Sequence, residues 1–258
     1  MASYQCSYCD RQLSSRTNRS RHVRVYHASC VGGSGGAAAG ELPGSSLVGP
    51  TSEYIKPQLR LPFSMIISGQ SSSGKSYFCA TMLKNPEIYF DGKFDKIMYC
   101  YTMYQPVLFQ SLSNVDFFYG FPSESDIPAN CLVVLDDLLS EASNSELLLK
   151  LFTVYRHKNV SVIFITQNFY HEGKALKTAS RNAHYLAIFP NPRDMSMVKT
   201  LGYQMYPHKS NFLPDAFRQA IATPRGFLFI DLKPDTDQKL RVLSGMNLGE
   251  HTYAYLPK

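Results

Sequence analysis

The residues "GQSSSGKSY", numbered 69 to 77, have the types and the spacing of a phosphate-binding loop. Gly69, four intervening residues, Gly74, Lys75 and Ser76 fit the pattern G-x-x-x-x-G-K-[ST], with an apolar run before it and a helical pattern after it. Glycine lets backbone N–H groups turn toward phosphate oxygens, and the amino end of the following helix adds positive charge. The loop is therefore predicted to bind ATP. The expected nucleotide-binding residues are Gly69, Gln70, Ser71, Ser72, Ser73, Gly74, Lys75, Ser76 and Tyr77.

Two adjacent acids, Asp136 and Asp137, end the apolar run "CLVVLD" about sixty residues further on. Lys75 is expected to reach the β- and γ-phosphates, while the hydroxyl of Ser76 and the carboxylate of Asp136 hold Mg²⁺. Asp137 is then placed to orient or deprotonate an attacking water molecule. Adjacent acids after a phosphate loop favour hydrolysis over transfer to an organic acceptor, which makes a kinase the least favoured enzyme class.

Gln167 ends a further apolar run, "VSVIFIT" (160–166). An amide at this point can contact the γ-phosphate or its attacking water and so report the state of the nucleotide. A polar residue at a strand end is often just the point where the strand meets solvent. The two motifs before it favour the functional interpretation, and we count Gln167 with Lys75 and Asp137 as catalytic.

The first 29 residues contain a second candidate metal site, Cys6-x2-Cys9-x12-His22-x4-His27. Two thiolates and two imidazoles at this spacing resemble the ligands of a C2H2 zinc finger. Zinc binding is worth ~10 to 16 kcal/mol, enough to fold a module too small to have its own core. We therefore expect Zn²⁺ and a small ββα module here.

Positive charge is concentrated in the same module, which has five arginines and one aspartate, whereas the whole chain has a net charge of +6. Such a patch suits an anionic partner, and phosphate contacts to DNA would be tolerant of sequence and sensitive to salt. A single finger reads only ~3 base pairs, so docking onto a protein is the alternative. The expected DNA contacts are Arg16, Arg19, Arg21 and Arg24.

The remaining patterns indicate the domains and the fold. Residues 30–52 are rich in Gly, Ala and Ser and predict a flexible linker between the module (1–29) and an ATPase domain (53–258). In that domain, strands are expected at 63–68, 96–102, 131–136, 160–166, 185–189, 226–232 and 239–244, and helices at 75–84, 143–158, 193–202 and 213–223. Their alternation predicts an α/β fold with a mostly parallel sheet and helices on both faces. The last two strands are expected to form a hairpin or an edge pair.

Composition excludes some classes of protein. The apolar fraction of 44% is ordinary for a chain with a real core. No apolar run approaches the ~18 residues of a membrane span, and the first residues lack the apolar core of a signal peptide. The six cysteines are scattered apart from one pair, which favours a reducing compartment. We expect a protein that works inside the cell, without a membrane partner.

Taken as an ordered set, "IISGQSSSGKS", "LVVLDDLL", "YRHKNVSVIFITQNFY" and "RNAHYLAIFPNPRD" resemble the FtsK–HerA superfamily of P-loop ATPases. Within it, the chain is similar to the genome-packaging ATPases of the poxvirus type and of Polinton/adintovirus-like elements. The resemblance covers roughly residues 60 to 232. The superfamily often has a glutamate where this chain has Asp137.

The resemblance implies a motor that forms a ring, often a hexamer, and moves double-stranded DNA into a preformed capsid. In this superfamily, an arginine eleven residues before the sensor glutamine enters the ATP site of the neighbouring subunit, and Arg156 stands there in this chain. It also implies a capsid or portal protein as partner, and a place in the nucleus or cytoplasmic factory of an infected cell or in the virion. A cellular helicase-like DNA pump and a zinc-finger regulator with a nucleotide-switched domain remain the alternatives.

Overall fold

The computed structural model of the chain describes residues 57–142, 145–167, 174–193 and 195–257, together with three strands nearer the amino end. Those three are β1 (Tyr4–Gln5), β2 (Gln12–Leu13) and β3 (Ser45–Val48). The other strands are β4 (Ser64–Ser68), β5 (Lys96–Tyr101), β6 (Asp116–Tyr119), β7 (Cys131–Asp136), β8 (Ser161–Thr166), β9 (Tyr185–Ile188), β10 (Leu228–Asp231), β11 (Val242–Ser244) and β12 (Tyr253–Pro257). Within the described ranges, none of the helices has both the length and the apolar character that crossing a membrane requires.

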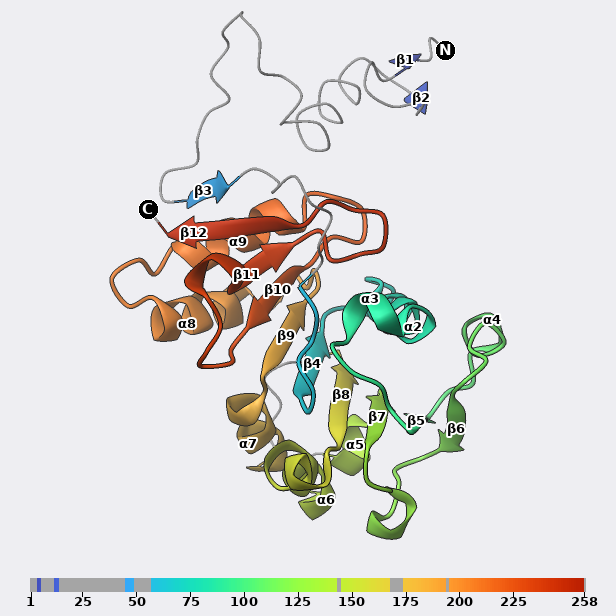
Figure 1. Cartoon of the computed structure of the whole chain (residues 1–258). Coiled ribbons are helices and arrows are strands. Elements are labelled where there is room, and N and C mark those ends of the chain that lie inside the picture. The colour runs from blue at the N-terminus through green and yellow to red at the C-terminus, as the bar shows by residue number, and fades with distance from the viewer. Residues whose placement is uncertain are drawn as a thin grey trace, which may run out of the picture.

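A ten-stranded sheet, in the order β3-β12-β11-β10-β9-β4-β8-β7-β5-β6, organises the fold (Figure 1). The strands from β9 to β6 are all parallel to one another, and those from β10 to β3 pair in antiparallel fashion. The predicted α/β fold with a mostly parallel sheet is confirmed for the part that carries the motifs. The expected pairing of the two last predicted strands is confirmed as the antiparallel pair β10–β11.

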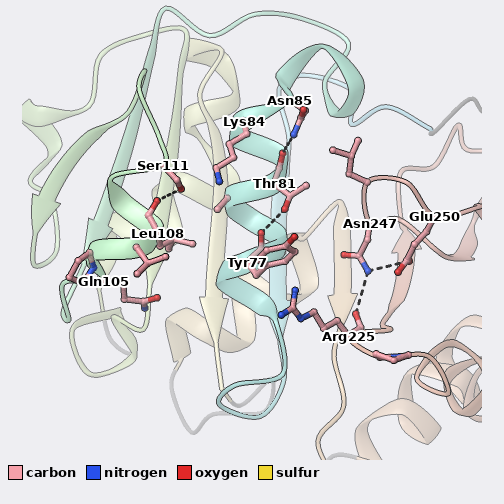
Figure 2. A pocket seen from close by; sticks show the side chains of 15 residues that line it. Tyr77, Thr81, Lys84, Asn85, Gln105, Leu108, Ser111, Arg225, Asn247 and Glu250 are labelled. Atoms are coloured by element: carbon pink, nitrogen blue, oxygen red, sulfur yellow. Dashed lines mark hydrogen bonds between the residues drawn. The ribbon is translucent and has the colours of Figure 1, made fainter. Parts of the chain in front are cut away.

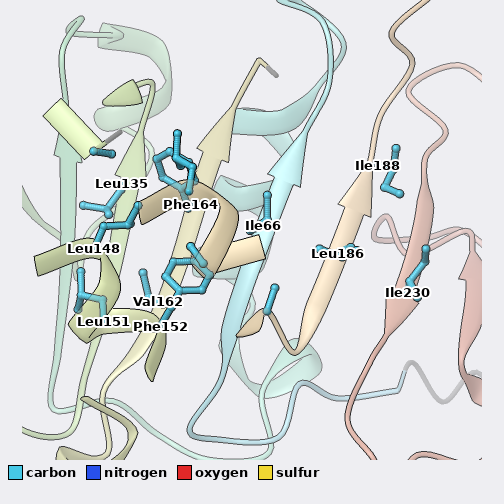
Figure 3. Close-up of a cluster of buried hydrophobic side chains, with 14 of the residues drawn as sticks. Ile66, Leu135, Leu148, Leu151, Phe152, Val162, Phe164, Leu186, Ile188 and Ile230 are labelled. Carbon is cyan, nitrogen blue, oxygen red and sulfur yellow. The ribbon is translucent and has the colours of Figure 1, made fainter. Parts of the chain in front are cut away.

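Helices cover both faces of the sheet, as predicted. One face carries α2 (Lys75–Lys84), α3 (Pro86–Tyr89) and α4 (Pro106–Phe109), which pack into one apolar cluster. The other carries α5 (Leu139–Ala142), α6 (Glu146–Thr153), α7 (Lys174–Asn182), α8 (Met195–Met205) and α9 (Phe212–Ala220), which pack into a second cluster. Figure 3 shows part of this second core, where Leu148 and Phe152 of α6 and Val162 and Phe164 of β8 gather with side chains of neighbouring strands.

Burial explains why the central strands could be predicted from sequence. Every residue of β4, β7 and β8 is buried, because helices cover both of their faces. Such strands are continuously apolar instead of alternating. The helix expected at 75–84 is likewise confirmed as α2.

The helix expected at 143–158 is shorter than predicted. Within its described part, α6 ends at Thr153, and residues Tyr155–Lys158 form a separate 3₁₀ turn, η3. Asn159 then adopts φ 55°, a left-handed conformation that ends the turn. The tighter turn brings the chain directly into β8.

The region before residue 57 is described only at its three strands. β1 pairs with β2 in antiparallel register, with Tyr4 opposite Leu13. Cys6, Cys9, His22 and His27 lie outside the described residues, as do Arg16, Arg19, Arg21 and Arg24. Among the residues that are described, no group of three or more His, Cys, Asp or Glu side chains could hold a metal ion. Residues 45–48, inside the range predicted as linker, form β3 and pair with β12.

Candidate functional site

The phosphate-loop residues 69–74 connect the carboxyl end of β4 to the first residue of α2. Gly69 has φ 150°, and a Cβ there would lie 2.5 Å from the Cβ of Phe189. Gly74 has φ 111° and precedes α2, where its carbonyl accepts the N–H of Phe78 at 2.9 Å. The two glycines are therefore required by the close approach of Phe189 and by the left-handed entry into the helix.

Lys75 is held inside this loop. Its Nζ donates to the carbonyl oxygens of Gly69 and Gln70 at 2.8 and 2.9 Å, and the residue is only 8% exposed. Burial lowers the pKa of Lys75, while the charges of Asp136 and Asp137 act in the opposite direction. The ammonium group is thus bonded to the loop carbonyls, while the charges of two carboxylates favour its protonated form.

The loop also contains a buried polar atom without a hydrogen bond. In the described part of the chain, only Ser73 Oγ and Arg241 Nε are buried side-chain polar atoms with no partner. Such atoms are costly to leave unsatisfied, and each calls for an explanation. Ser73 does not line the cavity over the loop, so its hydroxyl is not assigned to a bound phosphate.

Asp136 is the acid that faces the loop. Its Oδ2 accepts hydrogen bonds from Ser76 Oγ at 3.2 Å and from the phenol of Tyr99 at 2.6 Å, and the residue is 6% exposed. Burial raises the pKa of Asp136, and the bonds from Tyr99 and Ser76 lower it. A hydroxyl and a carboxylate side by side are oxygen ligands of the kind that Mg²⁺ takes together with phosphate and water. The two residues predicted to hold Mg²⁺ are therefore in contact.

The contribution of Tyr99 to the site was not predicted, because Tyr99 lies inside the apolar run of β5 and is typical of a core aromatic residue. Its ring does pack in the core, 5.4 Å from that of Phe109 and 5.9 Å from that of Phe117. Only the pairing of β5 with β7 brings its hydroxyl to Asp136. A tyrosine in a strand carries no sequence signal for that contact.

Asp137 and Gln167 form a second pair at the same edge of the sheet. The Nε2 of Gln167 lies 3.3 Å from both carboxylate oxygens of Asp137. Asp137 adopts φ 55°, and its backbone N–H donates to the carbonyl of Ile165 at 3.2 Å. This left-handed conformation turns the acid away from the strand direction that Asp136 follows. The predicted catalytic acid and the predicted sensor amide are thus in contact.

These groups line one cavity of about 390 Å³ over the phosphate loop. The cavity is also lined by Arg225 and Gln105, which the sequence does not single out. Arg225 precedes β10, and β10 runs antiparallel to β9, so the amino end of β10 lies at the edge where the parallel strands end. The only sequence signal is the Pro224–Arg225–Gly226 turn before a predicted strand.

Arg156 lies far from this cavity. It is an exposed residue of η3, at the amino end of β8, whereas the phosphate loop follows the carboxyl end of the parallel strand β4. Arg156 therefore lies at the opposite edge of the sheet from Lys75 of the same chain. Arg156 does not line the cavity of its own chain.

Comparisons with known proteins give one partial family match. The family model described as "Poxvirus A32 protein" matches residues 107–203. This segment includes Asp136, Asp137, Arg156 and Gln167 but not the phosphate loop. No curated protein matches the chain.

Solved structures show a more distant likeness. The genome packaging NTPase B204 from Sulfolobus turreted icosahedral virus 2, in complex with sulfate, is 13% identical with a TM-score of 0.46, over 73% of this chain and 98% of that one. The DNA-packaging ATPase B204 from Sulfolobus turreted icosahedral virus is 12% identical with a TM-score of 0.45, over 69% and 96%. The flagellar accessory protein FlaH from Methanocaldococcus jannaschii is 13% identical with a TM-score of 0.37, over 52% and 74%.

Proposed function

We propose that the protein is an ATPase that couples ATP hydrolysis to the movement of double-stranded DNA, and that it packages a viral or virus-like genome. One observation carries the hydrolytic part of the proposal. Ser76 and Asp136 on one side, and Asp137 and Gln167 on the other, meet over a single phosphate loop. This combination supplies a place for the metal and a place for the water in the same cavity.

Each residue has a distinct role in the proposed reaction. The loop N–H groups and Lys75 hold the triphosphate, and Ser76 and Asp136 hold Mg²⁺, which when bound neutralises phosphate charge. Asp137 orients the attacking water and accepts its proton as the water oxygen bonds to the γ-phosphorus. The bond from that phosphorus to the bridging oxygen breaks, and ADP and phosphate leave. Gln167, through its contact with Asp137, positions the same water.

The position of Arg156 fits a ring of identical subunits in which neighbouring copies share ATP sites. It lies at the edge of the sheet opposite its own phosphate loop and is exposed, so it serves as an arginine finger only if a neighbouring copy presents its site there. Such an arginine contributes ~10³ to 10⁵ in rate by stabilising charge on the transferring phosphoryl group. The proposal therefore needs a homo-oligomer, and a hexameric ring is the form that the superfamily resemblance implies.

The cargo and setting rest on sequence similarity. The match of residues 107–203 to the Poxvirus A32 protein family supports the viral, genome-packaging kind of motor. A zinc finger on Cys6, Cys9, His22 and His27 would then bring the motor to DNA, or dock it on a capsid or portal protein. In this setting the protein acts within an infected cell or in the virion.

Steady-state ATP hydrolysis by the purified protein, with and without long double-stranded DNA, tests the proposal. We expect strong stimulation by DNA, and loss of all hydrolysis in Lys75→Ala. Hydrolysis that ignores DNA would refute the motor. The absence of hydrolysis would favour a nucleotide-switched DNA-binding regulator instead.

A further inference from the structure

We propose that the groove along the exposed face of α2 binds the nucleobase and ribose of the nucleotide, and that Tyr77 and Arg225 form its stacking platform. This inference rests on the proposed function, since the phosphates of the same nucleotide occupy the phosphate loop. It extends the site from Tyr77, the last residue of the phosphate-loop stretch, to Arg225 and the groove along α2, which no motif marks.

The groove is a cavity of about 680 Å³ between three segments of the chain (Figure 2). Its floor is α2, from Tyr77 through Thr81 to Asn85. One wall is the start of α4 with Gln105, and the other is the loop with Asn247 after β11. A volume of this size is typical of small-molecule sites in proteins.

The groove is continuous with the cavity over the phosphate loop. Tyr77, Gln105 and Arg225 line both. Tyr77 follows the loop residues Lys75 and Ser76 directly in the chain, so the groove opens beside the place proposed for the phosphates. A nucleotide whose phosphates occupy the loop can therefore extend its ribose and base into the groove.

Tyr77 and Arg225 present flat, polarisable surfaces at the junction. The guanidinium carbon of Arg225 lies 4.5 Å from the centre of the Tyr77 ring, and Tyr77 is 53% exposed. Arg225 is held in a left-handed conformation, with φ 57°, and its carbonyl oxygen lies 3.4 Å from Nδ2 of Asn247. Bases stack on aromatic rings and on guanidinium planes, because each offers a planar face of matching size.

The walls have the chemistry of a base site and not of a backbone site for DNA. Asn85 and Asn247 place side-chain amides along the groove, where Nδ2 of Asn85 donates to the carbonyl of Thr81 at 2.8 Å. Glu250 places a carboxylate on the same wall as Asn247, 3.2 Å from its Nδ2. A polyanion would meet only Lys84 and Arg225 as cations in this groove and would be repelled by Glu250. One neutral heterocycle suits such a surface better than a run of phosphates.

The test compares ATP with inorganic tripolyphosphate, which lacks base and ribose, by calorimetric titration of the full-length protein. Thr81→Phe fills the groove without touching the phosphate loop, and Tyr77→Ala removes the platform. Thr200→Phe and Tyr203→Ala are matched controls. Thr200 and Thr81 both bond a helical carbonyl four residues back at 2.9 Å, and Tyr203 is exposed like Tyr77.

We expect both groove variants to weaken ATP binding about tenfold to hundredfold and to leave tripolyphosphate within about twofold of wild type, because stacking on one base is worth that much. The controls bind both ligands as wild type does. ATP affinity unchanged in Tyr77→Ala and in a folded Thr81→Phe overturns the inference, as does wild-type protein that binds both ligands equally tightly. If wild-type protein binds neither ligand, the proposed ATPase function is refuted as well. This outcome distinguishes failure of the proposed function from failure of the base site alone.

Discussion

The hydrogen bond from Tyr99 to Asp136 provides a test of how the metal site is built. Tyr99→Phe removes one hydroxyl and leaves the ring that packs on Phe109 and Phe117. The bond is 2.6 Å long and ends on a buried carboxylate, which is the range of charge-assisted O–H···O⁻ bonds. If Tyr99 positions Asp136, the substitution weakens the Mg²⁺-dependent part of nucleotide binding.

The magnitude follows from the charge of the acceptor. A hydrogen bond to a charged group contributes ~1.5 to 3 kcal/mol, so we expect about a tenfold or larger loss of the affinity that Mg²⁺ adds to ATP binding. Tyr255→Phe is the control, since its hydroxyl lies 2.9 Å from the neutral Ser244 Oγ and is also buried. That substitution is expected to cost ~0.5 to 1.5 kcal/mol of folding free energy and to leave the effect of Mg²⁺ unchanged.

The assay measures ATP affinity in Mg²⁺ and in EDTA for wild type and both variants, with unfolding by denaturant measured in parallel. A Tyr99→Phe protein that is less stable but gains as much affinity from Mg²⁺ as wild type would refute the reasoning. In that case Tyr99 would stabilise the core and not the metal site.

Three further predictions concern the loop, the catalytic acid and a buried histidine. Gly69→Ala, whose new Cβ would lie 2.5 Å from that of Phe189, should lower the free energy of unfolding by ~1 to 3 kcal/mol and abolish ATP binding, measured by denaturant unfolding and calorimetry. Asp137→Asn should lower kcat about 10²-fold or more with little change in ATP affinity, and equal losses in both would argue against a role as base. His184 accepts the N–H of Ser64 at 3.0 Å on Nδ1, and burial, with nearby cationic residues, lowers its pKa. Because its pKa is lower in the folded chain, His184 takes up a proton at higher pH in the unfolded chain than in the folded one. The stability that neutral His184 contributes is therefore present above the unfolded pKa of about 6.5 and is lost as pH falls below it. Thermal unfolding at pH 7.5 and 5.5 should show a smaller loss in His184→Asn than in wild type.

Local patterns allowed the parallel half of the fold and its loop to be predicted. The bounds of α2 and β7 follow from an apolar run and a motif that are both contiguous in sequence. The place of Lys75 in the loop and the contact of Ser76 with Asp136 could be predicted because the motif spacing and the end of the strand carry that information. These signals do not depend on the rest of the chain.

The remaining features depend on contacts between distant segments. Arg225 reaches the site only because β10 runs antiparallel to β9. The apolar run "GFLFIDL" predicts a strand but not its direction. Tyr99 reaches Asp136 only through the pairing of β5 with β7. α6 ends at Thr153, and the 3₁₀ turn after it brings Tyr155 into the core. The apolar residues of 143–158 continue at helical spacing through Tyr155, so the sequence predicts one longer helix.

Movement along DNA is the central claim, and displacement of a triplex-forming oligonucleotide from one end of a long duplex measures it most directly. We expect the wild-type protein with ATP and Mg²⁺ to release the oligonucleotide after a delay that grows with duplex length, and Lys75→Ala to release none. Hydrolysis of ATP without release, or release with no dependence on length, would contradict the account.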